Sequence, residues 1–211
     1  MIRNHDSVPD EDDLFLMRVA DKARCQIEVI LSNHRVTLPR RMEMLRNGEI
    51  DLVIGASKVP EREAFGYFSL PYRTERIRVW ARVADKTRVQ GKTAPQLIDE
   101  GWRLIGPGQG WFGTYYEGLQ KQPNKVIEFK QFSQGVRLLV GKRGDLLLGD
   151  EVWPSRLEAA DQQALYQLPD LLHEDPVYIL YSRKTVDESV VARMDVAIKA
   201  LGIMPATSIE P

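Results

Sequence analysis

Residues 42–72 read MEMLRNGEIDLVIGASKVPEREAFGYFSLPY, and this stretch decides how we interpret the whole chain. Its first part belongs to a predicted helix that begins near Pro39 and ends at the Asn47-Gly48 pair, since proline favours helix starts and glycine favours helix ends. Residues 50–56, IDLVIGA, are a short apolar run of the kind found in strands buried on both faces. The stretch therefore predicts a helix that leads into a buried strand.

Helices and strands alternate in the same way along the rest of the chain. We expect helices over residues 11–24, 95–100, 134–140, 153–160 and 187–201, and strands over residues 26–32, 77–83, 102–105, 126–129, 145–149 and 177–181. Such alternation predicts an α/β architecture with a mainly parallel sheet. Two blocks of it predict two lobes, residues 1–82 plus 177–211 and residues 83–176, with a ligand cleft between them.

The composition argues against several classes of protein. The 211 residues include 29 basic and 30 acidic side chains, so the chain lacks the positive charge typical of nucleic-acid binders and no nucleic-acid partner is expected. No apolar run is long enough to span a membrane, and the acidic cluster at residues 10–13 is unlike a signal peptide. We therefore expect either a cytoplasmic protein or a processed or recloned form of an exported one.

Residues 108–113, GQGWFG, match the G-x-G-x-x-G pattern of dinucleotide-binding proteins, and Glu128 follows at the spacing of that pattern's acidic residue. Two bulky aromatic residues in the loop and too few following strands favour a different interpretation. We interpret the run as a turn whose backbone amides can donate to a small anion such as a carboxylate. Trp111 is notable because a large aromatic side chain in such a turn is expected to pack over another group.

No metal site, cofactor or nucleophile is expected from the remaining residues. The three histidines lie far apart, Cys25 has no histidine near it, and no serine lies in a G-x-S-x-G motif. An enzyme would have to use carboxylates that no motif marks. The arginines at positions 73, 76, 78 and 82 surround one predicted strand, and their spacing predicts a solvated face.

The stretch 42–72 resembles the bacterial periplasmic solute-binding proteins for polar amino acids, known as solute-binding family 3. In that family a helix ends in an L-x-x-G-x-x-D phrase, a buried strand follows, and T-x-x-R and F-S-x-P-Y phrases come next. The matching positions here are Leu45, Gly48, Asp51, the segment 60–62 and residues 68–72. The glycine-rich turn, the DLLLGD strand that ends at Asp150 and the final helix follow the same plan more loosely.

The resemblance implies an α/β fold of the two-lobed type II periplasmic-binding kind, with crossing strands as a hinge and a ligand clasped in a cleft between the lobes. It implies a monomeric, non-enzymatic periplasmic protein. Such a protein closes on a small polar solute, an amino acid or related carboxylate, and hands it to an ABC transporter in the membrane. It implies neither a cofactor nor a metal.

The resemblance also implies a set of ligand-binding residues. Arg62 takes the position of the arginine that grips the ligand α-carboxylate, and Asp150 that of the aspartate that receives the α-ammonium, in agreement with the chemistry of both side chains. Ser57 falls on a strand-end residue near the carboxylate, and Gly55 precedes it where close backbone approach is useful. The expected set is completed by Trp111, Phe112, Thr114 and Tyr72.

The sequence departs from the family pattern in three places. Trp111 and Phe112 replace small hydroxyl residues in the turn of the second lobe, Val59 replaces the threonine of the T-x-x-R phrase, and residues 1–6 stand where the family has a longer apolar strand. A bulkier second lobe fits an aromatic ligand, a ligand other than an amino acid, or none. Two alternatives stay open: a sensing domain of a receptor, and a dehydratase-type enzyme with Asp150, Glu151 or Glu128 as general acid or base.

Overall fold

Two units make up the chain in the computed structural model, which describes residues 11–28 and 36–203. One unit consists of Met1–Thr74 and Asp175–Pro211, and the other of Glu75–Glu174. The chain passes between them twice, within strand β3 (Arg73–Arg82) and within strand β8 (His173–Ser182). The sequence predicts these boundaries after residues 82 and 176. An unbroken strand pattern does not show at which residue the chain leaves one unit for the other.

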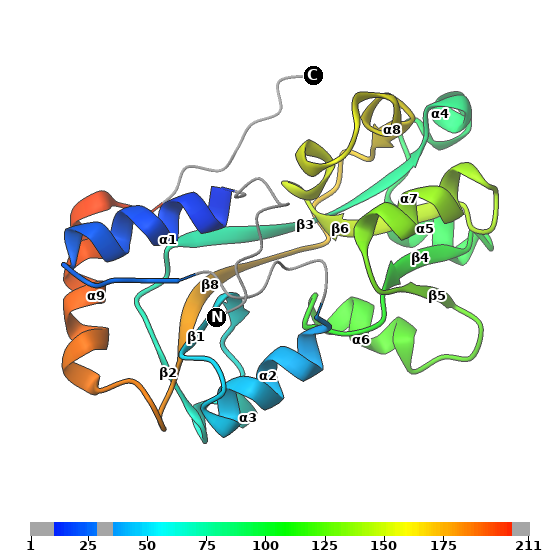
Figure 1. Ribbon diagram of the computed structural model, residues 1–211. Coiled ribbons are helices and arrows are strands. Elements are labelled where there is room, and N and C mark those ends of the chain that lie inside the picture. Colours follow the sequence, from blue (N-terminus) through cyan, green and yellow to red (C-terminus); the bar gives the residue numbers. More distant parts are fainter. Residues whose placement is uncertain (1–10, 29–35, 204–211) are drawn as a thin grey trace. The chain divides into compact units, whose positions relative to one another are not determined.

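In the first unit, strand β8 lies between two antiparallel neighbours. Strand β1 (Leu52–Ser57) pairs with one edge of β8 and strand β2 (Gly66–Phe68) with the other. Helices α1 (Glu11–Lys22) and α9 (Glu188–Leu201) lie side by side on one face of these strands (Figure 1). Helix α2 (Leu38–Asn47) packs on the other face, and the short helix α3 (Pro60–Glu63) connects β1 to β2.

Each face of this small sheet has its own apolar core. The core under α1 and α9 includes Phe15, Val19, Ile179 and Met194, and the core under α2 consists of Leu45, Val53, Ala56 and Leu180. Burial of this apolar surface is what holds the helices onto the strands.

The predicted helix ends are confirmed at two positions. Gly48 adopts φ 76°, and the amides of Gly48 and Glu49 donate to the carbonyls of Leu45 and Met44 at 3.1 and 2.9 Å, which is the expected glycine-terminated helix end. At the start of α9, the Asp187 carboxylate accepts a hydrogen bond from the Ser189 amide at 2.8 Å.

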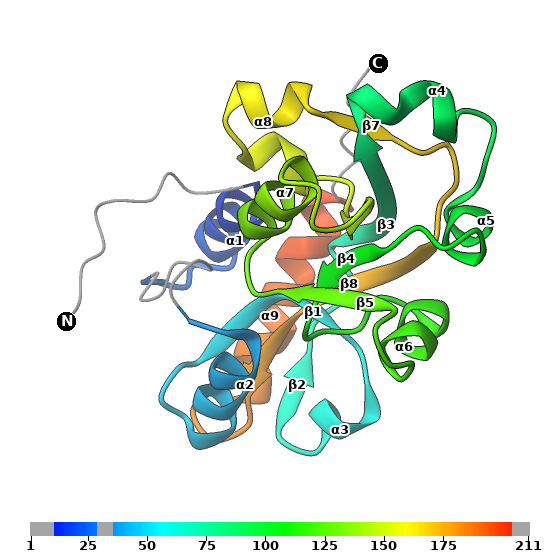
Figure 2. The same ribbon diagram turned by 90° about the vertical axis from the view of Figure 1, so that its right-hand side faces the viewer.

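In the second unit, strand β3 lies between the antiparallel strands β7 (Leu165–Gln167) and β6 (Leu146–Asp150). Strand β4 (Leu104–Pro107) then pairs in parallel with β6 and with β5 (Val126–Phe129). Helices α5 (Ala94–Asp99) and α6 (Thr114–Gln120) cover one face, and α7 (Phe132–Val140) covers the other (Figure 2). The remaining elements are the 3₁₀ turns η1 (Val83–Asp85) and η2 (Trp153–Arg156) and the helices α4 (Lys86–Val89) and α8 (Ala159–Gln163).

Most predicted elements are present, and three predictions differ from the structure. The sheet is not mainly parallel, because β1 and β2 run antiparallel to β8 and β6 and β7 run antiparallel to β3. Residues 153–160 form a 3₁₀ turn and the start of a separate helix, since Leu157 and Glu158 have an extended backbone that separates the two. Of the predicted strand 26–32, residues 26–28 have no regular secondary structure and residues 29–32 lie outside the described part of the chain.

An ion-pair network in the second unit gives a prediction on pH. Arg82 Nε donates to Asp85 Oδ2 at 2.6 Å, and Arg88 Nη1 donates to Asp85 Oδ1 at 3.0 Å. Burial alone raises the pKa of Asp85, but the hydrogen bonds from Arg82 and Arg88 outweigh it and lower the pKa below its usual 3.8. A lowered carboxyl pKa contributes stability that is complete above the unfolded pKa and is lost as pH falls through the folded pKa.

We therefore expect Asp85→Asn to lower the free energy of unfolding at pH 7 by roughly 1 to 2 kcal/mol. The difference from the parent protein should shrink as pH falls below about 4, where the parent carboxyl becomes protonated too. Urea unfolding at pH 7, 4 and 2.5 measures this. A difference that is the same at all three pH values would contradict the assignment.

Candidate functional site

The first group of predicted site residues lies where β1 ends. Gly55 has φ 74°, and the pairing of β1 with β8 shifts its register between Val53 and Ala56. At this bulge the alternation of side chains between the two faces of the sheet shifts by one residue, so Val53 and Ala56 both lie in the core under α2. Gly55 itself is exposed, and Ser57 closes the strand. The bulge thus presents the backbone of Gly55 at the surface of the first unit.

Arg62 is attached to this strand end. It lies in α3, which begins at Pro60, and its Nη1 donates to the carbonyl oxygen of Ser57 at 2.7 Å. The side chain is half-buried. This hydrogen bond restrains the guanidinium, whose planar fork of N–H donors matches the geometry of a carboxylate. The structure therefore brings Gly55, Ser57 and Arg62 together, as the resemblance implies.

Tyr72, also in the predicted set, is fully buried in the core of the first unit. Its hydroxyl donates to Asp12 Oδ1 at 3.0 Å, and its ring stacks on Phe15 with centroids 5.3 Å apart. Burial and the charge of Asp12 hold the pKa of Tyr72 well above its usual value, so the hydroxyl stays protonated. A Cβ atom on Gly55 would lie 3.8 Å from this hydroxyl, so Tyr72 supports the bulge from behind.

Asp12 and Arg73 form a buried ion pair that the sequence analysis missed. Arg73 Nε and Nη2 donate to the two carboxylate oxygens of Asp12 at 2.9 and 3.3 Å, and both side chains are about 9% exposed. The prediction of a solvated arginine face is wrong for Arg73, because Asp12 at the start of α1 satisfies its charge inside the unit. No signal in the sequence connects positions 61 residues apart.

In the second unit, the glycine-rich turn after β4 is held by its own ring contacts. Gly113 has φ 90° and ψ 158°, a backbone region almost restricted to glycine. A Cβ atom there would lie 2.6 Å from Cγ of His173. Trp111, two residues earlier, meets the same His173 ring edge-on with centroids 6.2 Å apart. The half-buried Trp111 thus covers His173, a residue that the sequence analysis left out of the site.

The other two predicted residues of this turn have different surroundings. Phe112 is 8% exposed and packs edge-on against Tyr116 and Trp153, so its side chain belongs to the core of the second unit. Thr114 is the first residue of α6 and is exposed. Of this group, Trp111 and Thr114 are therefore the residues that can reach a bound molecule.

Asp150 ends β6 and is fully buried, opposite Ile77 of β3. The alternative that it caps a helix is wrong, because η2 begins at Trp153 with Val152 in the capping position. The Trp153 ring lies against Gly149, where a Cβ atom would be 2.6 Å from Cε3, and also contacts Phe112. Trp153 thereby links the glycine-rich turn to the strand end that carries Asp150.

The carboxylates named for an enzymatic alternative do not form an obvious acid and base pair. Glu151 forms ion pairs with Arg76 at 3.7 Å and Arg78 at 3.4 Å. Glu128 lies on β5 against Gly108, where a Cβ atom would be 2.8 Å from its Oε2. Within residues 11–28 and 36–203, no group of three histidine, cysteine, aspartate or glutamate residues can hold a metal ion. Nor is any helix of these ranges long and apolar enough to cross a bilayer.

Comparisons with known proteins place these observations in a fold. No protein-family model and no curated protein sequence matches the chain. Holo ArgBP from T. maritima has a TM-score of 0.71 at 19% identity, and the match covers 92% of this chain and 81% of ArgBP. The chain has the periplasmic-binding fold.

Two further solved structures show the same periplasmic-binding fold. The arginine-, lysine-, histidine-binding protein ArtJ from Geobacillus stearothermophilus matches with a TM-score of 0.68 at 17% identity, covering 89% of this chain and 77% of ArtJ. The GluR0 ligand-binding core from Nostoc punctiforme, in complex with L-glutamate, has a TM-score of 0.68 at 16% identity, covering 89% of this chain and 82% of its own. The predicted fold class is confirmed.

Proposed function

We propose that this protein is an extracytoplasmic solute-binding protein that takes up a small polar ligand, an amino acid or a related carboxylate, for an ABC transporter. The observation that carries the proposal is the guanidinium of Arg62, fixed by its 2.7 Å hydrogen bond to the Ser57 carbonyl beside the Gly55 bulge. A guanidinium that is already oriented binds a carboxylate with less loss of side-chain entropy than a mobile one. In this proposal Arg62, Ser57 and Gly55 bind the ligand carboxylate, and Tyr72 supports them from the core.

In this proposal, residues of the second unit bind the ammonium group of the ligand. Asp150 is a buried carboxylate at a strand end, and a ligand ammonium is the kind of cation that such a group binds. Trp111 and Thr114 offer an aromatic edge and a hydroxyl from the turn, and Phe112 holds that turn to Trp153. An α-amino acid carries both a carboxylate and an ammonium group, and so matches the chemistry of Arg62 and of Asp150.

The ligands named for the similar structures agree with this chemistry. ArgBP has been solved in an arginine-bound form, an amino acid ABC transporter substrate-binding protein AbpA from Streptococcus pneumoniae was solved with L-arginine, and the GluR0 core holds L-glutamate. These ligands differ in their side chains and share the α-ammonium and α-carboxylate. Among them, AbpA is a substrate-binding protein of an amino acid ABC transporter, which supports, as part of the proposal, a transporter partner and with it a periplasmic location. The proposal assigns no catalytic step.

A thermal-shift screen tests the proposal. The purified chain is heated with each common amino acid, with small dicarboxylates and with aromatic acids. A ligand at a hundred times its Kd adds about 2.7 kcal/mol, which corresponds to roughly 5 to 10 °C for a chain of this size. We expect at least one α-amino acid to produce such a shift and Arg62→Ala to reduce it by at least about half. Arg18→Ala is the matched control, because Arg18 is an exposed guanidinium on α1 of the same unit.

Retention of the full shift in Arg62→Ala would contradict the role given to Arg62. A panel in which no compound raises the melting temperature would contradict the proposed function itself.

A ligand-sensing role is the second candidate, favoured by the likeness to the GluR0 ligand-binding core. It predicts the same ligand and the same loss in Arg62→Ala. The two roles differ in the partner, so uptake of the labelled ligand into vesicles that carry the transporter distinguishes them. Uptake that depends on the added protein supports transport, and its absence beside normal binding supports sensing.

A further inference from the structure

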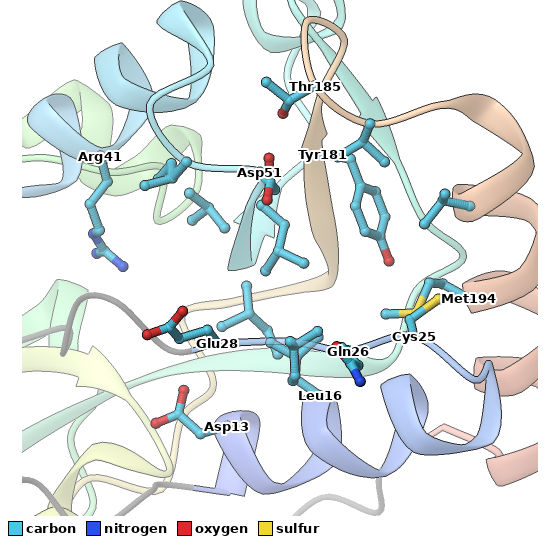
Figure 3. Close-up of a pocket in the computed structure, with 17 residues that line it drawn as sticks. Asp13, Leu16, Cys25, Gln26, Glu28, Arg41, Asp51, Tyr181, Thr185 and Met194 are labelled. Atoms are coloured by element: carbon cyan, nitrogen blue, oxygen red, sulfur yellow. The ribbon is translucent and has the colours of Figure 1, made fainter. Parts of the chain in front are cut away.

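The two units carry different surface features. In the first unit, a hollow of about 630 Å³ between β1 and residues 25–28 has a largely apolar lining that includes Leu16, Leu52 and Met194 (Figure 3). In the second unit, exposed basic side chains gather at the end of the sheet where β3 ends and where β4, β5 and β6 begin.

Arg82, the last residue of β3, joins the segments that form this end. Its guanidinium donates to Asp85 Oδ2 at 2.6 Å and to the carbonyl oxygen of Gly144 at 2.7 Å. The carbonyl oxygen of Arg103 in turn accepts a hydrogen bond from the Asp145 amide at 2.9 Å. The loop after β3, the start of β4 and the loop before β6 therefore meet at one end of the sheet.

Six exposed cations lie around Arg82, and we call them the basic surface. They are Lys86 and Arg88 in α4, Arg103 before β4, Lys125 before β5, and Lys142 and Arg143 in the turn after α7. Strands β4 and β5 pair in parallel from Leu104 and Val126 onward, so Lys125 lies beside Arg103. The basic surface thus draws on four segments of the second unit.

The carboxylates at this end neutralise only part of the positive charge. Asp85 pairs with Arg82 and Arg88 at 2.6 and 3.0 Å. Asp145 pairs with Arg82 and Arg103 at 3.4 and 3.6 Å. Among the residues that the structure describes, the cations that form no ion pair with a carboxylate are Lys86, Lys125, Lys142 and Arg143. Because the whole chain has a formal net charge of −1, positive charge is concentrated here.

Neighbouring acidic residues mark where this surface ends. Lys92 and Glu100 pair with each other at 2.6 Å and add no net charge. Helix α8, which carries Asp161 and follows Glu158, ends next to a residue whose carbonyl accepts from the Val83 amide at 2.9 Å. The excess of positive charge is therefore limited to one side of the end of the sheet.

Apolar groups lie among these cations. Val83 and Val140 are 46% and 48% exposed, although both are aliphatic. The Arg88 guanidinium lies over the Trp102 ring, with Cζ 4.8 Å from the ring centroid. Basic side chains beside exposed aliphatic and aromatic groups are the composition that favours contact with the headgroup region of a membrane.

The type of cation distinguishes between two kinds of anionic partner. Of the four cations without a carboxylate, three are lysines. A lysine ammonium is a hydrated point charge on a flexible stem, whereas the planar arginine fork matches a single carboxylate or phosphate. Point charges spread over several segments favour an extended anionic surface over one acidic side chain.

We propose that the basic surface of the second unit binds the surface of an anionic lipid bilayer. Each lysine or arginine near such a surface strengthens binding about fivefold, and the attraction decays within a Debye length of about 10 Å at about 0.1 M salt. β6 begins at this end of the sheet and reaches Asp150 at its other end. Contact with a bilayer therefore leaves the strand end that carries Asp150 uncovered.

Vesicle co-sedimentation of the full 211-residue chain tests this proposal. One set of vesicles contains equal parts of phosphatidylglycerol and phosphatidylcholine, and the other contains phosphatidylcholine alone. We expect at least about tenfold stronger binding to the anionic vesicles, and loss of that binding when NaCl is raised from about 0.05 M to about 0.5 M. No solute is present, so the outcome does not depend on the proposed function.

Charge variants place the contact on the basic surface. The double variant Lys142→Gln with Arg143→Gln should bind anionic vesicles about 10- to 30-fold more weakly than the parent. The matched control is Lys130→Gln with Lys199→Gln, which removes the same charge from two exposed positions, one after β5 at the other end of the sheet and one on α9 of the first unit. The control should bind within about twofold of the parent, and circular dichroism confirms that the variants fold.

A second pair keeps the test decisive if the first does not fold. Lys86→Gln with Lys125→Gln removes two charges of the basic surface from other segments and should weaken binding by a similar factor. Arg143→Lys keeps the charge and should bind like the parent, because a bilayer surface does not require the arginine fork.

Several results would overturn the proposal. These are no binding to anionic vesicles at low salt, equal binding to phosphatidylcholine alone, and binding that neither double variant of the basic surface weakens. Binding of a polyglutamate peptide without binding of vesicles would show that the partner is an acidic polypeptide instead. Loss of binding in Arg143→Lys would show recognition of one anionic group by the guanidinium, which also contradicts contact with an extended surface.

Discussion

Asp12→Ala is expected to lower the free energy of unfolding by roughly 3 to 5 kcal/mol, the usual cost of removing one partner of a buried ion pair. The carboxylate of Asp12 accepts two hydrogen bonds from Arg73 and one from the hydroxyl of Tyr72. The variant leaves the Arg73 charge inside the unit without this counter-charge and removes the partner of a fully buried hydroxyl. Chemical denaturation followed by circular dichroism measures the loss.

Two further variants separate charge from packing. Asp21→Ala removes an exposed carboxylate from the same helix and should change stability by less than about 0.5 kcal/mol. Replacing both partners, as in Asp12→Leu with Arg73→Met, should recover much of the loss, because an apolar pair carries no desolvated charge. A cost for Asp12→Ala as small as that of Asp21→Ala would show that the ion pair does not hold α1 to β3.

Gly113→Ala is expected to have the second-largest effect, a destabilisation of about 2 to 4 kcal/mol. The backbone at φ 90° and ψ 158° disfavours any side chain, and the new Cβ atom would lie 2.6 Å from the ring of His173. The turn or the ring has to move, so the contact between Trp111 and His173 changes as well. Thermal unfolding reports the stability, and tryptophan fluorescence reports the ring contact.

Gly118→Ala is the matched control, five residues further along. Gly118 lies in α6, and nothing is within 4 Å of the Cβ atom it would gain. Alanine should stabilise that helix by up to about 1 kcal/mol, since glycine is the poorer helix former. If both substitutions had the same sign, the strain assigned to Gly113 would be wrong.

Local patterns in the sequence predict much of the fold. The glycine that ends α2, the acidic start of α1 and the apolar runs of β1 and β6 each depend on residues near one another in the chain. The direction of the strands does not follow from such patterns, because an apolar strand can be buried on both faces whether its neighbours run parallel or antiparallel to it. β8 returns antiparallel to β1 after more than a hundred intervening residues, and only the folded chain shows this.

The candidate site divides in the same way. The motif that contains Arg62 predicts a position near Ser57, because the two residues are five apart in the sequence. In the structure their hydrogen bond places them side by side. The roles of Arg73, Trp153 and His173 depend on partners far away in the sequence, so spacing alone predicts an exposed arginine and leaves both rings without a role in the site.

The central claim is that Arg62 binds the carboxylate of an amino-acid ligand, and a calorimetric cycle tests it most directly. The cycle titrates the best ligand of the screen and its carboxamide into the parent chain and into Arg62→Ala. The account predicts that the carboxamide binds the parent about 10- to 100-fold more weakly than the amino acid. It predicts that this preference is much smaller in Arg62→Ala, because the guanidinium contact is lost and only Ser57 and Gly55 remain for the carboxylate. An equal preference for the carboxylate in both proteins would contradict the account.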